Sequence, residues 1–229
     1  ASMDPSYLKK ALDTLEVYDR FRGKLEPKVN PNLRPMLSHS DTMIMINVFQ
    51  ILRNIDPQHS ALYTSRIAER VQELFRYFVK PDKEALLETV GPNGEMTEGC
   101  EGRTINPGHA IETSWFLMSE ARFTQDKELM SKAINILSWS LERGWDTEFG
   151  GLFSFIDIEG RQPAQIEWDM KYWWPHCEAL IATLMAFVST KDRCWERWFE
   201  VIHDYTFSHF PDRVYGEWFG YLHRDGSIA

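Results

Sequence analysis

Apolar residues recur every three or four positions in seven segments of the chain, which is the period of one buried face of an α-helix. The first two segments run from about Tyr7 to Tyr18 and from Met43 to Leu52. The other five are expected at about residues 60–78, 109–122, 126–143, 175–189 and 191–209. The pattern predicts an all-α protein with about seven helices.

Three segments between the predicted helices carry turn residues in place of a helical period. They span residues 86–98, 151–165 and 216–229, with turn signals at Pro92-Asn93-Gly94, Glu159-Gly160 and Asp225-Gly226. Such residues favour tight turns between paired strands. Each segment is therefore expected to form a short β-hairpin.

An internal repeat links the second and third of these segments. Residues 149–155 (FGGLFSF) parallel residues 215–221 (YGEWFGY). Gly108-His109 and Pro175-His176, 67 positions apart, each open a predicted helix after a turn segment. Repeated helix pairs bury their apolar faces against neighbours, and inner and outer helices can close into a ring. Two separate helical domains would leave this equal spacing unexplained.

The same period suggests that residues 4–229 are only part of such a ring. A third helix of this kind would begin near position 243, about 14 positions past Ala229. We expect an incomplete barrel that lacks its N-terminal portion and its last C-terminal helices. Residues 1–3 (ASM) are set aside as an expression remnant.

Composition narrows the class of protein further. With 229 residues, 43% of them hydrophobic, the chain can bury a sizeable core. No apolar run approaches the roughly 20 residues of a membrane span, and a net charge of −9 argues against nucleic-acid binding. Cys100, Cys177 and Cys194 are widely spaced, which fits free thiols in a reducing cytoplasm and offers no paired metal-ligand spacing. We expect a soluble cytoplasmic protein without nucleic-acid or membrane partners.

A candidate catalytic pair lies at the start of the fourth predicted helix. Asn106 is suited to cap it and Pro107 to occupy its first position. His109 and Glu112 then share a face one turn apart. The positive end of the helix dipole is expected to keep the His109 imidazole neutral, as a general base requires. The alternative is a histidine that only makes a structural hydrogen bond, with Glu112 supporting the cap.

A second constellation, residues 167–178 (EWDMKYWWPHCE), combines three tryptophans with charged side chains. Sugar-binding sites use this combination, because aromatic faces stack on the sugar ring and carboxylates bind its hydroxyl groups. Trp174 and Glu178 are expected to face the same way, one helical turn apart. The alternative for Trp168 and Trp173 is an aromatic layer of the core.

The remaining histidines are expected to be structural. His176 points away from the side that Trp174 and Glu178 share. The others stand outside either constellation and include His39, His59, His203 and His209. No HxxxH or HExxH spacing occurs, so no metal site is predicted.

Several of these motifs resemble the signature of the N-acylglucosamine 2-epimerase family. They are residues 102–112 (GRTINPGHAIE) with Trp115-Phe116, residues 150–153 (GGLF), residues 167–171 (EWDMK), residues 173–179 (WWPHCEA) and residues 216–221 (GEWFGY). The motifs are long, occur in order and extend from about Arg103 to Leu222.

The resemblance implies a partial (α/α)6 barrel with short β-hairpins and reversible inversion at C2 of an N-acyl hexosamine. It implies that N-acetylglucosamine and N-acetylmannosamine interconvert when a base removes the C2 proton and an acid returns one on the opposite face. By the match, His109 is one of two acid/base histidines, Glu112 supports it and Glu178 lies in the sugar pocket. The expected substrate-binding residues are Arg103, Asn106, Trp115, Lys171 and Trp174.

Two parts of the family pattern have no match in this chain. The motif of the second histidine and a substrate-facing arginine are both absent. One base can exchange a C2 proton but cannot easily deliver it to both faces, so we expect this chain alone to be inactive as an epimerase.

Other activities stay open beside this expectation. Within the superfamily the alternatives are a cellobiose 2-epimerase or a mannose isomerase, and outside it a non-catalytic binding or interaction module. The resemblance implies no redox cofactor, ATP as an allosteric activator rather than a reactant, and a homodimer of the full-length protein. The sequence has no P-loop on which an argument for ATP could rest.

Overall fold

The computed structural model describes residues 4–24, 32 and 35–229, and the three residues set aside at the N-terminus lie outside this range. Within it, the expected seven helices are confirmed. They are α1 (Pro5–Phe21), α2 (His39–Ile55), α3 (Ser60–Tyr77), α4 (Pro107–Thr124), α5 (Lys127–Gly144), α6 (Trp173–Thr190) and α7 (Arg193–His209). Three short 3-10 helices lie at Pro57–His59, Pro81–Lys83 and Cys100–Arg103.

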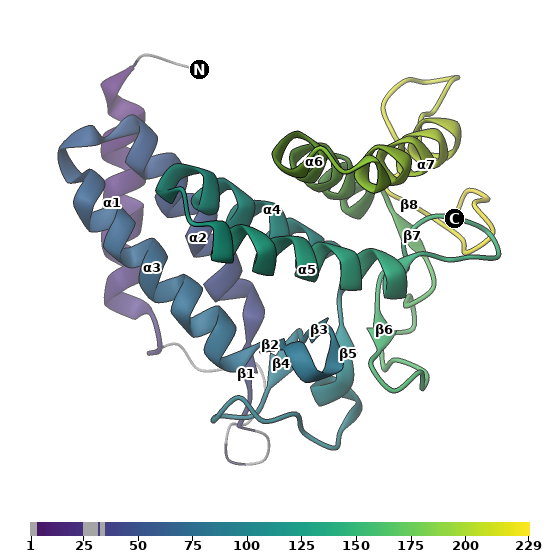
Figure 1. The fold of residues 1–229 in the computed structure, drawn as a ribbon, viewed down its shortest axis with the longest axis horizontal. Coiled ribbons are helices and arrows are strands. Elements are labelled where there is room, and N and C mark those ends of the chain that lie inside the picture. Colours follow the sequence, from purple (N-terminus) through teal and green to yellow (C-terminus); the bar gives the residue numbers. More distant parts are fainter. Residues whose placement is uncertain (1–3, 25–31, 33–34) are drawn as a thin grey trace.

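The helices from α2 onward pack as consecutive pairs. The most extensive contacts join α2 to α3, α4 to α5 and α6 to α7. Across the pairs, α4 contacts both α2 and α6, so α2, α4 and α6 form one layer and α3, α5 and α7 cover it. Figure 1 shows the pairs following one another from α2/α3 on the left to α6/α7 on the right.

Helix α4 is the most buried element because it has neighbours on several sides. Ala110, Ile111, Leu117 and Met118 are fully buried and point to different sides of the helix. A helix that is apolar around most of its circumference belongs in a protein interior. Residues on the partly exposed face of α4 are therefore held by a well-packed scaffold.

The described helices do not close into a ring. No extensive contact joins α2 to α6 among the described residues, although each packs against α4. Large apolar side chains remain exposed along both helices: Ile44, Ile51 and Ile55 on α2, and Ile181, Leu184 and Val188 on α6. This is the architecture of part of an α/α barrel, as the helix repeat predicts.

Short antiparallel strands connect the helix pairs, and their pairing differs from the three local hairpins expected. Strand β5 (Thr104–Ile105) pairs with β6 (Ile156–Asp157), and β7 (Lys171–Tyr172) pairs with β8 (Tyr221–Leu222). Strand β1 (Leu37–Ser38) pairs with β4 (Thr89–Val90). These pairs join segments from successive repeats, because each turn segment lies beside the next helix start.

Local pairings also occur among the described residues, and two of them lie at or beside a predicted hairpin. Strands β2 (Val79–Lys80) and β3 (Ala85–Leu86) form a hairpin that lies just before the first predicted one. In the third predicted hairpin, a single bridge joins Leu222 to Ile228 around the Asp225-Gly226 turn.

The internal repeat is visible in hydrogen bonds as well as in sequence. The Asp146 carboxylate accepts from the backbone N–H groups of Glu148 and Phe149 in the loop after α5. In the loop after α7, Asp212 accepts in the same way from Val214 and Tyr215. Equivalent loops therefore follow equivalent helices.

None of the described helices is both long enough and apolar enough for a bilayer crossing.

Candidate functional site

His109 lies in the first turn of α4, where local capping fixes its position. The Asn106 side chain accepts a hydrogen bond from the His109 backbone N–H at 3.1 Å, and Pro107 occupies the first helical position. Both features confirm the predicted helix start. The His109 side chain is about one-quarter exposed, so one side of the ring is accessible.

A carboxylate that sequence reasoning missed holds the other side of the ring. Nδ1 of His109 lies 3.0 and 3.1 Å from the two carboxylate oxygens of Glu88. The backbone of Glu88 bridges two elements, since its N–H donates to Thr104 and its C=O accepts from His39. No local pattern around Glu88 points to this contact.

The pair shifts both pKa values toward the charged forms. Burial alone lowers the pKa of His109, but the hydrogen bond and negative charge of Glu88 outweigh it and raise the pKa above the ordinary value. Burial alone raises the pKa of Glu88, yet hydrogen bonds and charge from the histidines lower it to about 2. Glu88 thus raises the pKa of His109, which is opposite in direction to the influence expected from the helix dipole.

Glu112 and Glu178 form a second acidic group beside His109. Burial and the negative charge of Glu178 raise the pKa of Glu112 to about 7, and nearby His109 offsets this only in part. Burial also raises the pKa of Glu178, although Trp115 donates its indole N–H to that carboxylate at 2.6 Å. The negative charge of Glu178 thus favours the protonated form of Glu112.

Aromatic side chains border the same region. The rings of His109 and Trp174 lie 5.3 Å apart between centroids, so α6 places an indole beside the imidazole. Gly108 makes this approach possible, because a Cβ atom there would lie 2.6 Å from the Trp174 ring. The predicted grouping of His109, Glu112, Trp115, Trp174 and Glu178 is thus brought together from α4 and α6.

Three other predicted site residues make structural contacts. The Arg103 Nε donates to Asp157 at 2.8 Å, and the side chain is nearly buried. Lys171 is fully buried and its Nζ lies 2.9 Å from Asp146. Asn106 is buried as the cap of α4. In this structure the polar groups of these three residues contact other residues of the same chain.

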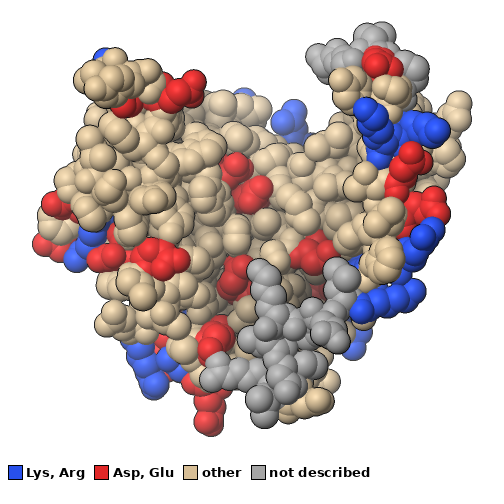
Figure 2. Space-filling model, turned by 180° about the vertical axis from the view of Figure 1, so that it is seen from behind, with Lys and Arg blue, Asp and Glu red and all other residues tan. Residues whose placement is uncertain are grey.

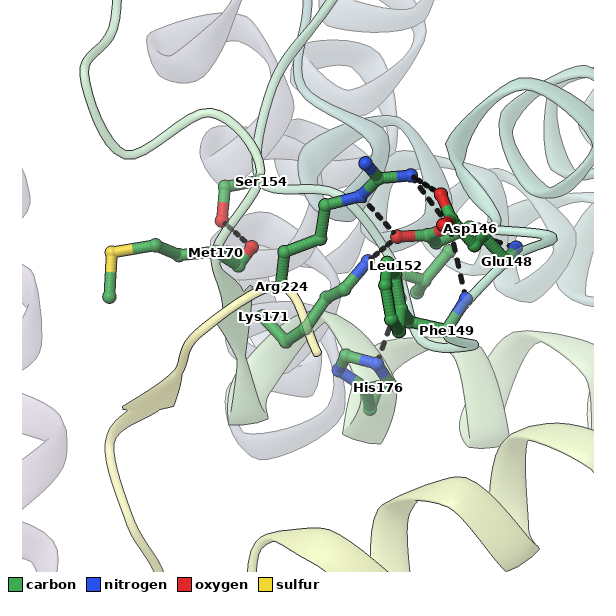
Figure 3. A network of polar contacts seen from close by, with 9 residues as sticks. All are labelled: Asp146, Glu148, Phe149, Leu152, Ser154, Met170, Lys171, His176 and Arg224. Atoms are coloured by element: carbon green, nitrogen blue, oxygen red, sulfur yellow. Dashed lines mark hydrogen bonds and ion pairs between the residues drawn. The ribbon is translucent and has the colours of Figure 1, made fainter. Parts of the chain in front are cut away.

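Figure 3 shows the network that holds Lys171. Lys171 and Arg224 reach the same carboxylate, with Arg224 Nε 2.9 Å from Asp146. Burial lowers the pKa of Lys171 to about 8, with the charge of Asp146 opposing the shift. The sequence alone did not indicate this contact, because Asp146 lies in the loop after α5, 25 positions before Lys171.

The structural role predicted for His176 is confirmed, whereas the position of His39 was not predicted. His176 is buried, accepts the Leu152 N–H at 2.9 Å and has its pKa lowered by burial to about 3, which confirms a structural role. His39, expected to stand outside any constellation, instead lies beside His109, with 6.4 Å between ring centroids.

The exposed surface behind the view of Figure 1 has an acidic middle. Figure 2 shows several Asp and Glu side chains near the centre of this face, while Lys and Arg lie mainly toward its edges. Anionic ligands would be repelled there, whereas neutral polar ligands would find hydrogen-bond acceptors.

Known proteins similar to this chain include a family of sugar epimerases. The profile of the N-acylglucosamine 2-epimerase (GlcNAc 2-epimerase) family matches residues 4–229. The N-acylglucosamine 2-epimerase of Bos taurus is 41% identical over 188 residues, which is 82% of this chain and 44% of that protein. The chain therefore spans less than half the length of this relative.

Solved structures share the fold at low sequence identity. A D-mannose isomerase superposes with a TM-score of 0.74 at 14% identity, covering 95% of this chain and 59% of that one. The cellobiose 2-epimerase of Bacillus thermoamylovorans gives 0.70 at 19% identity, covering 84% and 47%.

Proposed function

Because this chain belongs to the N-acylglucosamine 2-epimerase family, we propose that it forms part of an isomerase that interconverts N-acetylglucosamine and N-acetylmannosamine. The observation that carries the proposal is the contact between His109 and Glu88, which prepares one ring nitrogen for proton transfer. The activity is proposed for the protein as a whole, since the chain covers 44% of the bovine relative.

The proposed reaction begins with the open-chain sugar, whose C1 carbonyl acidifies the C2 proton. With Nδ1–H donated to Glu88, the second nitrogen of His109 presents its lone pair and removes that proton to give an enediolate. Glu88 then stabilises the imidazolium that forms, in the way a carboxylate supports a histidine base. A proton returned to the opposite face completes the inversion.

Glu112 and Glu178 are suited to the oxygen atoms of the sugar. With a pKa of about 7, Glu112 is present in both protonation states at neutral pH and can donate or accept a hydrogen bond. Trp115 orients Glu178 toward the same region. Trp174 offers an apolar face to the C–H surface of the substrate.

Proton exchange at C2 tests the proposal. N-acetylmannosamine is incubated with the chain in heavy water and followed at C2 by NMR. We expect deuterium to enter faster than without protein, and His109→Gln to abolish the difference. Exchange no faster than in the protein-free control, or unchanged by His109→Gln, would contradict the role proposed for His109. Accumulation of N-acetylglucosamine would show that this chain holds a second proton donor.

Two related activities are distinguished by substrate. The matched structures include a D-mannose isomerase and cellobiose 2-epimerases. The same exchange assay with mannose and with cellobiose compares the three reactions directly. We expect N-acetylmannosamine to exchange fastest, and a clear preference for either neutral sugar would reassign the substrate.

A non-catalytic interaction module is the second candidate, and one observation favours it. The exposed apolar side chains of α2 and α6 include Ile51 and Leu184, each about half exposed. Such surfaces mark association sites. Sedimentation of the chain with and without substrate measures association independently of proton exchange.

Four other features stay predictions. A homodimer of the full-length protein and ATP as an allosteric activator are part of the proposal, and the proton transfers require no redox cofactor. Cys100, Cys177 and Cys194 are free thiols, which supports a reducing cytoplasmic compartment.

A further inference from the structure

Three potential metal ligands converge from three separate segments of the chain. His39 begins α2, Glu88 lies between β3 and β4, and His109 lies in the first turn of α4. One donor atom from each residue lies within 4.8 Å of the other two. Glu88 is the central member, 3.0 Å from Nδ1 of His109 and 3.8 Å from Nδ1 of His39.

The hydrogen bonds of Thr113 determine which nitrogen of His39 carries the proton. The Thr113 hydroxyl donates to the backbone carbonyl of His109 at 2.7 Å, so its only hydrogen is already used. The same oxygen lies 2.9 Å from Nε2 of His39 and must therefore accept from that nitrogen. His39 is protonated on Nε2, and its Nδ1 presents a lone pair.

That lone pair has no hydrogen-bond partner within the described part of the chain. The His39 side chain is fully buried, and Nδ1 is one of few buried polar atoms left without such a partner there. Its nearest ionic neighbour, Glu88, offers only further acceptor oxygens, and 3.8 Å is too long for a hydrogen bond. Two acceptor atoms that face each other across 3.8 Å leave a position that a cation can fill.

We propose that His39, Glu88 and His109 form a binding site for a divalent transition-metal ion of the Zn²⁺ class. Two imidazoles and one carboxylate are a ligand set that such ions favour, with a fourth position left open. Tetrahedral bonds of this kind separate ligand atoms by roughly 3.3 Å. The 3.0 and 3.8 Å separations from Glu88 lie on either side of this distance, and the two histidine nitrogens, within 4.8 Å of each other, would move closer together on binding.

The surroundings supply the two other features of a metal site. Thr113 orients His39 through the nitrogen that does not face the ion, which is the usual support of a histidine ligand. A metal ion can reach the site past His109 and Glu88, because their side chains are 28% and 17% exposed.

Binding of the metal ion would change which nitrogen of His109 carries the proton. A metal on Nδ1 replaces the proton shared with Glu88, and the neutral imidazole then carries its proton on Nε2. The nitrogen proposed to remove the C2 proton would lose its free lone pair. Bound metal should therefore inhibit proton exchange at C2. This inhibition rests on the proposed function, whereas metal binding itself does not.

The test uses the metal-free chain titrated with Zn²⁺, and with Co²⁺ as an optical probe. We expect one ion per chain bound by wild type and by His203→Gln, a control at an exposed histidine on α7. His39→Gln should bind at least about 10-fold more weakly, because one ligand is lost. Glu88→Gln should weaken binding similarly and leaves the buried imidazole in place. Thermal unfolding verifies that each variant is folded.

A wild-type measurement avoids reliance on variants. Long-range ¹H–¹⁵N spectra should show Zn²⁺ shifting Nδ1 of His39 and His109 while Nε2 of His39 keeps its proton. Binding that is equally tight in His39→Gln, a thiolate absorption band with Co²⁺, or unshifted Nδ1 signals would overturn the proposal. If Zn²⁺ binds as expected but no C2 exchange is found without metal, the metal site stands and the proposed function fails.

Discussion

The Nδ1 atom of His109 lies 3.0 Å from the carboxylate of Glu88, a residue 21 positions earlier in the chain. Their contact joins the loop after β3 to the first turn of α4. It orients the imidazole and raises its pKa, so it couples the helix start predicted from sequence to a residue that no motif singles out. Glu88 is a positioning residue, because it acts through His109.

Replacing Glu88 by glutamine should slow proton exchange at C2 while sugar binding changes little. The amide keeps the shape of the side chain but cannot stabilise an imidazolium, so we expect the exchange rate to fall about 10- to 100-fold. NMR exchange rates at several concentrations of N-acetylmannosamine separate kcat from KM. Glu200→Gln, at an exposed position of α7, is the matched control. An equal loss of rate in both variants would remove Glu88 from the mechanism.

The carboxyl group of Glu112 should titrate near neutral pH. Its pKa of about 7 arises first from burial and then from the negative charge of Glu178. Glu178→Gln removes only the charge, so the pKa of Glu112 should fall but stay above its ordinary value. ¹³C NMR of labelled glutamate follows this titration, with Glu112→Gln assigning the signal. A titration near pH 4.5 in wild type would show that the group is well solvated.

Alanine in place of Gly108 should displace Trp174. A Cβ atom would lie 2.6 and 2.8 Å from ring atoms of Trp174, closer than packed carbon atoms approach, so the indole must move. We expect weaker sugar binding and altered tryptophan fluorescence, with the helix retained because alanine favours it. Gly220→Ala is the control, because the added methyl group meets open space there. Gly160→Ala is unsuitable, because Gly160 has a positive φ that alanine disfavours. Identical fluorescence in wild type and Gly108→Ala would show that Trp174 tolerates the added methyl group.

Acid should destabilise the network around Asp146. Its hydrogen bonds and charge contacts with Arg224 and Lys171 overcome the effect of burial and lower its folded-state pKa below the ordinary 3.8. A carboxylate with a depressed folded-state pKa contributes stability above its unfolded pKa and loses that contribution as pH falls. Urea unfolding of wild type should therefore show a falling free energy of unfolding below about pH 4.

Asp146→Asn is the matched variant for this pH dependence. It leaves the buried Lys171 ammonium without its counter-ion and should cost about 3 kcal/mol at neutral pH. The variant should lose less stability than wild type on acidification. Parallel pH profiles in the two proteins would mean that Asp146 does not supply this dependence.

Local patterns were sufficient for much of this fold. Apolar periodicity identified the seven helices of the described residues, and the cap formed by Asn106 with Pro107 located the start of α4. The repeated loop motifs correctly indicated equivalent loops after α5 and α7. These features depend on neighbouring residues in the chain, where side-chain spacing and backbone hydrogen bonding act over a few positions.

The tertiary structure decided which distant groups meet. Strand β5 pairs with β6 rather than within its own segment, and Lys171 finds its counter-ion in another loop. Glu88 and His39 reach His109 only because packing of α2 against α4 brings their loop and helix ends together. Composition and periodicity do not encode such contacts directly. They arise when separate apolar faces are buried together, and the polar groups carried with those faces must then satisfy one another.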